Sequence, residues 1–128
     1  MRKSLFAMLA CAALLLLLLP ATVLAAEIPA LDLSSATADD SGDGWAWNYS
    51  KKTLALNGVT IKADGTGILL PAGSTIELAA NSTNTVTCKS TLSGNLAGIE
   101  CQGKLTITGR GALTVNSGST GSGYSYGI

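Results

Sequence analysis

After residue 53, apolar residues recur in pairs separated by one polar or small residue, and this pattern constrains the fold more than any other feature of the chain. Side chains alternate between the two faces of a strand, so both members of a pair point to the same side. Each pair therefore predicts a very short strand with one core face and one solvent face. The pairs are Leu54/Leu56, Val59/Ile61, Ile68/Leu70, Ile76/Leu78, Val86/Cys88, Ile99/Cys101, Leu105/Ile107 and Leu113/Val115.

The pairs also recur in a fixed order, which aligns them in three columns of equivalent strands. The first column aligns 67–70, 98–101 and 127–128, the second 53–56, 75–78 and 104–107, and the third 59–61, 86–88 and 113–115. Self-similarity at a period of about 20 to 50 residues marks stacked repeat architectures. Three short strands per turn predict an all-β fold, a right-handed parallel β-helix or solenoid of about two and a half coils.

Glycine and asparagine fall between the columns, where the chain must turn a corner and a positive φ is needed. The corner segments are 57–58, 64–67, 72–74, 94–95 and 109–111. A β-sandwich is the structural alternative, because short strands with regular turns also suit it. Its antiparallel strands would usually be about five or six residues long and would leave the column order unexplained.

A segment with two tryptophans, Trp45-Ala46-Trp47, precedes the first coil and is predicted to form a β-hairpin-like N-terminal cap on it. Trp45 and Trp47 share one face of this strand. One interpretation is that they plug the open end of the core and cover its backbone edges. The other is a carbohydrate-binding platform, because a flat aromatic face complements the C–H face of a sugar. We favour the plug.

The N-terminus has the order of features that defines a signal peptide. Arg2 and Lys3 precede an uncharged, leucine-rich run that ends in small residues. We predict a signal peptide over 1–25, cleaved after Ala25, and hence a secreted or cell-surface protein that meets the membrane only through this segment. An uncleaved anchor is the alternative, because about 20 apolar residues cross a bilayer. Pro20 argues against it.

The remaining chain is long enough for one small domain. We assign 26–43 to an N-terminal extension or linker and 44–128 to the β-helix. Residues 127–128 open another first-column strand, so we expect either a fragment truncated at its C-terminal end or an open edge that binds a partner strand.

The ionisable residues exclude several functions. Two of the eight basic residues, Arg2 and Lys3, lie in the leader, so the exported part is net negative and nucleic acid is not an expected partner. The chain has no histidine, which excludes serine or cysteine nucleophiles paired with a histidine base. Glu77 and Glu100 are outward positions in different columns, unlike the paired carboxylates of glycosidases. Arg110 has no acid beside it. We predict no catalytic residue.

Two features invite a site interpretation. Residues 39–44 alternate acids with small residues like the opening of a calcium loop, but the twelfth position is Ser50 instead of the required glutamate. We favour a solvated turn, with no cofactor and calcium only as the alternative. Cys88 and Cys101 both fall on inward positions. They are either two small core residues or, after export, a disulfide.

The chain resembles a family of secreted bacterial right-handed parallel β-helix proteins described as carbohydrate-binding-domain-containing. The likeness covers 42–128 and is carried by 44–47, 52–58, 66–68, 97–99 and 103–109. It implies a non-catalytic secreted or cell-surface module for polysaccharide binding or adhesion, with calcium as an occasional family attribute. No compact acidic site here matches a family calcium or sugar site. The alternative, by fold analogy, is a fragment of a pectate-lyase-like enzyme whose catalytic coils are missing.

Overall fold

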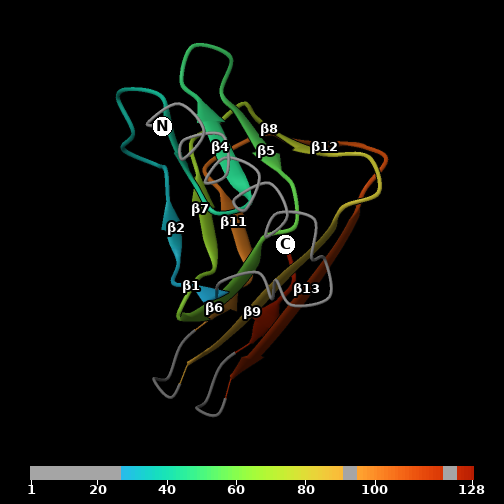
Figure 1. The fold of residues 1–128 in the computed structure, drawn as a ribbon. Coiled ribbons are helices and arrows are strands. Elements are labelled where there is room, and N and C mark those ends of the chain that lie inside the picture. The colour runs from blue at the N-terminus through green and yellow to red at the C-terminus, as the bar shows by residue number, and fades with distance from the viewer. Residues whose placement is uncertain (1–26, 91–94, 120–123) are drawn as a thin grey trace, which may run out of the picture.

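Short strands stacked in successive turns form the body of the protein (Figure 1). The structure is a computed structural model that describes residues 27–90, 95–119 and 124–128, so the predicted signal peptide lies outside the described residues. Within these ranges there is no α-helix, and hence none long and apolar enough to span a membrane. The predicted all-β parallel β-helix is confirmed. The strands are β1 (Glu27–Ile28), β2 (Leu31–Asp32), β3 (Asp40–Gly42), β4 (Trp45–Asn48), β5 (Thr53–Leu56), β6 (Thr60–Asp64), β7 (Ile68–Leu70), β8 (Ser74–Leu78), β9 (Thr83–Ser90), β10 (Leu96–Ala97), β11 (Ile99–Cys101), β12 (Leu105–Gly109), β13 (Ala112–Ser119) and β14 (Ser125–Tyr126).

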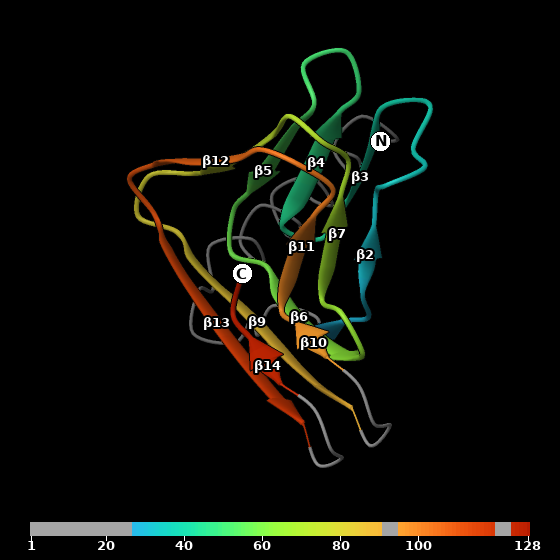
Figure 2. The ribbon, with the colours of Figure 1, turned by 180° about the vertical axis from the view of Figure 1, so that it is seen from behind.

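Three sheets wrap around one core, one sheet for each predicted column (Figures 1 and 2). The first contains β2, β7 and β11, the second β3, β4, β5, β8 and β12, and the third β1, β6, β9 and β13. A small fourth sheet pairs β10 with β14 beside β11. All pairings are parallel except those of β4, which lies antiparallel to both β3 and β5. The axis runs across Figure 1 from the blue strands on the left to the red strands on the right.

The alignment predicted for the first column is confirmed residue by residue. Ile99 lies beside Ile68, and Cys101 lies beside Leu70. The backbone N–H of Ile99 donates to the carbonyl oxygen of Gly127 at 2.9 Å, which places 127–128 where the alignment expects the next strand.

The alignments predicted for the second and third columns are each wrong at one strand. β12 in the second column and β9 in the third are shifted by two residues from their predicted positions. Leu105 lies beside Ser74, and Ile107 lies beside Ile76. In the third column Val86 lies beside Ile61. A shift of two keeps every side chain on its predicted face, so the core residues were identified correctly while their neighbours were not.

Buried polar side chains explain the shift. Ser74 and Asn84 point inward and are 1% and 0% exposed, so β8 and β9 begin earlier than their apolar pairs indicate. A search for apolar residues cannot identify an inward serine or asparagine as part of the core.

The helix also begins earlier than predicted. Part of the segment 26–43, assigned to an extension, instead forms a partial first turn. In it, Ile28 of β1 lies beside Ile61, and Leu31 of β2 lies beside Ile68. Leu31 and Leu33 are buried in the core. Leu31-Asp32-Leu33 is itself an apolar pair separated by one polar residue, but it lies before the three-column repeat from which the start of the helix was predicted.

Rows of aliphatic side chains, one row for each inward position, fill the interior. Leu54 and Ile76 form one row, Ile61 and Val86 a second, and Ile68 and Ile99 a third, all 0% or 1% exposed. Burial of each such side chain contributes about 1.5 to 3 kcal/mol. The outward residues between them form three exposed faces, and the face over β3, β4, β5 and β8 is hollowed.

Candidate binding groove

The two tryptophans belong to the capping hairpin. β3 and β4 are joined by the two-residue turn Asp43-Gly44, in which Gly44 has a φ of 79°, as tight hairpin turns require. Trp47 lies beside Leu54, is only 2% exposed and belongs to the core. Trp45 is partly buried, packs against the core and lies over Gly42. This geometry agrees with the interpretation that the tryptophans plug the open end of the core. A sugar-binding platform made of both rings would need an exposed ring at Trp47, which the structure does not have.

The acidic segment before the hairpin is held as a strand and turn. Asp39 accepts a hydrogen bond on Oδ1 from the backbone N–H of Tyr49 at 2.8 Å, and Asp40 accepts one from Ser41 N–H at 2.8 Å. Among the described residues, no group of three or more acids or cysteines is placed to hold a metal ion. The segment is therefore the edge of the hairpin in this structure, and it borders the groove described below.

Cys88 and Cys101 are free thiols at different corners of the helix. The Cys88 sulfur lies 3.9 Å from the carbonyl oxygen of Ala97, whereas the Cys101 sulfur lies 3.2 Å from that of Pro71. The structure therefore does not pair them, and the disulfide interpretation is not supported by this geometry. Burial raises the pKa of the Cys88 thiol, and a backbone hydrogen bond with Gly67 partly opposes this shift.

Thiol counting tests this arrangement. We expect a thiol reagent to detect both cysteines in denaturant. In the native protein we expect partly exposed Cys101 to react within minutes and buried Cys88 far more slowly, because the thiolate is the reactive form. Finding no reactive thiol in the denatured, unreduced protein would instead establish the bond.

A groove of about 520 Å³ crosses the outer face of β3, β4, β5 and β8. Its floor is a row of outward residues placed side by side by the strand register: Ser41 beside Ala46, Ala46 beside Ala55, and Ala55 beside Glu77. The groove is hollow because its two central floor residues are alanines.

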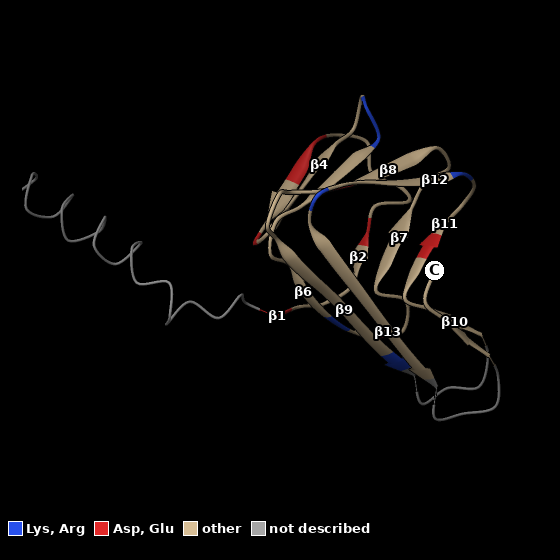
Figure 3. Cartoon of the chain, turned by 90° about the vertical axis from the view of Figure 1, so that its right-hand side faces the viewer, with Lys and Arg blue, Asp and Glu red and all other residues tan. Residues whose placement is uncertain are grey.

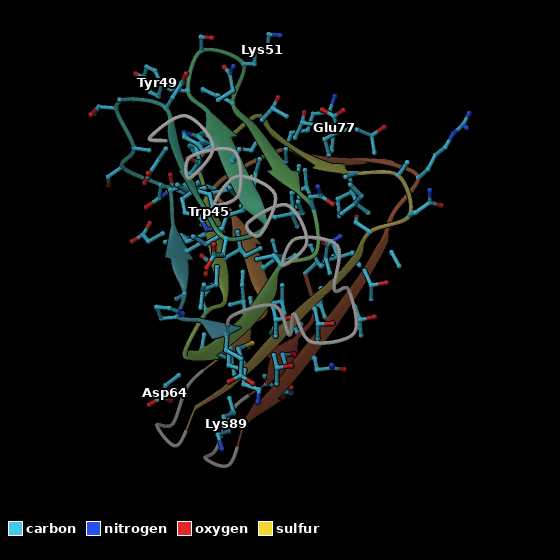
Figure 4. The ribbon with its side chains drawn as sticks, viewed as in Figure 1. Trp45, Tyr49, Lys51, Asp64, Glu77 and Lys89 are labelled. Atoms are coloured by element: carbon cyan, nitrogen blue, oxygen red, sulfur yellow. The ribbon has the colours of Figure 1, made fainter. Side chains whose placement is uncertain are left out.

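Polar side chains border this alanine floor at its two edges and at the β4–β5 turn. Asp39 and Asp40 line the β3 edge, Glu77 lines the β8 edge, and Asn48, Lys51 and Thr53 line the end at the β4–β5 turn. Asn48 fixes that turn, since its Oδ1 accepts hydrogen bonds from Lys51 N–H and the Ser50 hydroxyl, both at 2.9 Å. Figure 4 shows Lys51 on the turn and Glu77 on the far side of the face.

A second hollow of about 470 Å³ adjoins the first and shares Ala46 and Ala55 with it. Its other borders are Gly44, Trp45, Asn57 and Ala79. The backbone N–H of Asn57 donates to the carbonyl oxygen of Gly44 at 2.7 Å, which ties the hairpin turn to the end of β5. Trp45 thus borders the second hollow, whereas Trp47, although only 2% exposed, is among the residues that line the first groove.

The groove brings together residues that the sequence treats separately. Glu77, interpreted as isolated, shares it with Asp39 and Asp40, whereas Glu100 lies on β11 and Arg110 lies at the corner before β13, both outside it. Lys51, Asn48 and Thr53 have no motif that marks them as site residues. The hairpin pairing is the one signal that these residues lie close together. The sequence predicts this pairing for β4 but not for β3.

The fold places the chain in the class of parallel β-helix proteins. Comparisons with known proteins do not narrow this class, since the chain matches no protein-family model, and neither the search of curated proteins nor that of solved structures finds a match.

Proposed function

We propose that this chain is a non-catalytic, exported carbohydrate-binding module whose polysaccharide ligand lies across the outer face of β4, β5 and β8. The observation that carries the proposal is the groove of about 520 Å³ with an alanine floor and a rim of carboxylate, amide, hydroxyl and ammonium groups. Its volume falls within the range of about 300 to 1,000 Å³ that ligand sites occupy.

The chemistry of the rim suits a neutral or amino sugar. Sugar hydroxyls both donate and accept, so they pair with the carboxylates of Asp39 and Glu77 and with the ammonium group of Lys51. The small side chains of Ala46 and Ala55 leave room for the C–H face of a ring. Three acids against one lysine disfavour a polyanionic ligand such as polyuronate.

The leader supports export, and the proposed ligand is therefore a secreted or cell-surface glycan. The second hollow extends the face past Ala55 toward Trp45, so a chain of sugars has a continuous path along the sheet. This path supports binding of a polymer rather than a single sugar.

Glu77→Gln tests the proposal. We expect binding to the best polysaccharide on a glycan array to weaken about 10-fold or more, because a hydrogen bond to a charged group is worth about 1.5 to 3 kcal/mol. Isothermal titration gives the affinity. Glu100→Gln is the matched control, since Glu100 is also an exposed glutamate but lies on β11. Equal loss in both variants, or none in either, contradicts the groove.

Ala55→Trp gives a second test by filling the floor. The side chain faces outward, so we expect a folded protein that no longer binds. Release of new reducing ends, or of the unsaturated ends that β-elimination leaves, from polygalacturonate or other glycans incubated with the wild-type chain would contradict the non-catalytic proposal.

A further inference from the structure

An exposed aromatic ring stands at one end of the groove. The side chain of Tyr49 is 46% exposed and lies on the turn between β4 and β5. Its chain neighbour Asn48 and the nearby Lys51 both line the groove at this end. The other exposed aromatic rings of the described residues, Tyr124 and Tyr126, lie in and beside β14, which belongs to a different sheet. Tyr49 is therefore the exposed ring that adjoins the groove.

Hydrogen bonds on both sides hold the backbone of Tyr49 in place. Its N–H donates to Oδ1 of Asp39 at 2.8 Å, and its carbonyl oxygen accepts from the N–H of Lys52 at 3.3 Å. Lys52 has a φ of 48°, which is uncommon outside glycine, and its Nζ donates to the carbonyl oxygen of Ala72 at 3.2 Å. The turn is thus tied to the segment before β3 and to the corner before β8. A tyrosine on a backbone fixed in this way loses little conformational freedom when a ligand binds.

The turn also projects from the body of the molecule. In Figure 3 the β4–β5 turn, marked by its blue lysines, stands out beyond the strands of the sheet. Figure 4 shows Tyr49 and Lys51 together at this end, and Glu77 across the face from them. The turn therefore forms a wall at the end of the groove, while the two alanines form its floor.

The groups at this end suit one face of a sugar ring. The flat face of an aromatic ring packs well against C–H groups. A pyranose whose hydroxyls are all equatorial presents C–H groups on its two faces and its hydroxyls around the rim. With such a face on Tyr49, the rim hydroxyls can donate to the carboxylate of Asp39 and accept from the ammonium group of Lys51. A sugar with axial hydroxyls would place a polar group against the ring and leave it unpaired.

We infer that Tyr49 forms a third subsite of the groove, which binds by stacking a pyranose with equatorial hydroxyls, such as a β-linked glucose or N-acetylglucosamine unit. The inference rests on the proposed glycan-binding function and adds the class of sugar to it. The second hollow, the alanine floor and Tyr49 follow one another along β4, so consecutive sugars of an extended chain occupy them. The ligand is thus recognised as an oligosaccharide and not as a single sugar.

Titration calorimetry with cello-oligosaccharides and chito-oligosaccharides, from the monosaccharide to the hexasaccharide, tests the inference on protein produced from the full sequence. We expect the affinity of the wild type to rise with length until the subsites are filled and then to level off. Tyr49→Ala should lower the affinity for the longest oligosaccharide about 10-fold and level off at a shorter length, because stacking on the ring is lost. Tyr49→Phe keeps the ring and should stay within about 2-fold of the wild type. Tyr124→Ala is the matched control, since Tyr124 is 71% exposed but lies beside β14, and it should bind like the wild type.

The possible outcomes separate this subsite from the groove itself. Wild-type affinity of Tyr49→Ala at every length would overturn the subsite, and so would an equal loss in Tyr49→Phe, because the contact would then involve the hydroxyl rather than the ring. If neither series binds but a polysaccharide on the glycan array still binds and depends on Glu77, the sugar class is wrong and the proposed function stands. If no glycan binds at all, the proposed function itself fails. Circular dichroism establishes that each variant is folded.

Discussion

Replacing Asn84 with leucine is expected to destabilise the protein by about 3 to 6 kcal/mol, a large part of the stability of a small domain. Asn84 is fully buried. Its Oδ1 accepts from the backbone N–H groups of Gly58 and Val59 at 2.9 and 3.0 Å, and its Nδ2 donates to Ser82 Oγ and the Ala112 carbonyl at 3.0 Å. Leucine has a similar volume but leaves these groups unpaired, at about 1 to 3 kcal/mol each.

Chemical denaturation measures the effect. Asn116→Leu is the matched control, because Asn116 lies on the exposed face of β13, where a substitution is expected to change the stability by less than about 0.5 kcal/mol. Asn84→Asp should fall between the two, because the carboxylate still accepts from Gly58 and Val59 but cannot donate to Ala112. A leucine variant as stable as the control would mean that the four hydrogen bonds of Asn84 do not contribute to the stability of the protein.

Asn84 also marks the limit of what the sequence predicts. Alternation of apolar residues predicts the fold class and the inward face of almost every strand. It also predicts the alignment of the first column, because the inward positions that were aligned there are all apolar. The alignment of the other columns depends on inward polar residues. Asn84 is tolerated in the core because the neighbouring turns supply its partners, and no local pattern reveals those partners.

The candidate groove also has one part that the sequence predicts and one part that it does not. The alignment of Leu54 with Ile76 follows from the apolar pattern, and it places Glu77 beside Ala55. The pairing of β3 does not follow from any pattern, because Asp40-Ser41-Gly42 has no apolar residue and is held by hydrogen bonds to β4. The acidic edge of the groove was therefore predictable only as a turn, while its opposite edge was predictable as a strand.

Gly109→Ala is expected to be at least as disruptive, with a loss of more than about 3 kcal/mol or failure to fold. Gly109 has a φ of 106°, which L-residues rarely adopt. A Cβ there would also clash with the carbonyl oxygen of Leu78, its neighbour in the turn below. Backbone cannot yield as a flexible side chain can, so β12 would have to separate from β8.

Two other glycines separate these effects. Gly73 has a φ of 80° but no atom within 4 Å of an added Cβ, so Gly73→Ala should cost only the backbone strain of about 1 to 2 kcal/mol. Gly118, on β13, has open space and no positive φ, and alanine there should be neutral or slightly stabilising. Thermal or denaturant unfolding should rank the losses Gly109, Gly73, Gly118. Equal losses at Gly73 and Gly109 would show that strain alone, and not the close approach of two turns, requires glycine before Arg110.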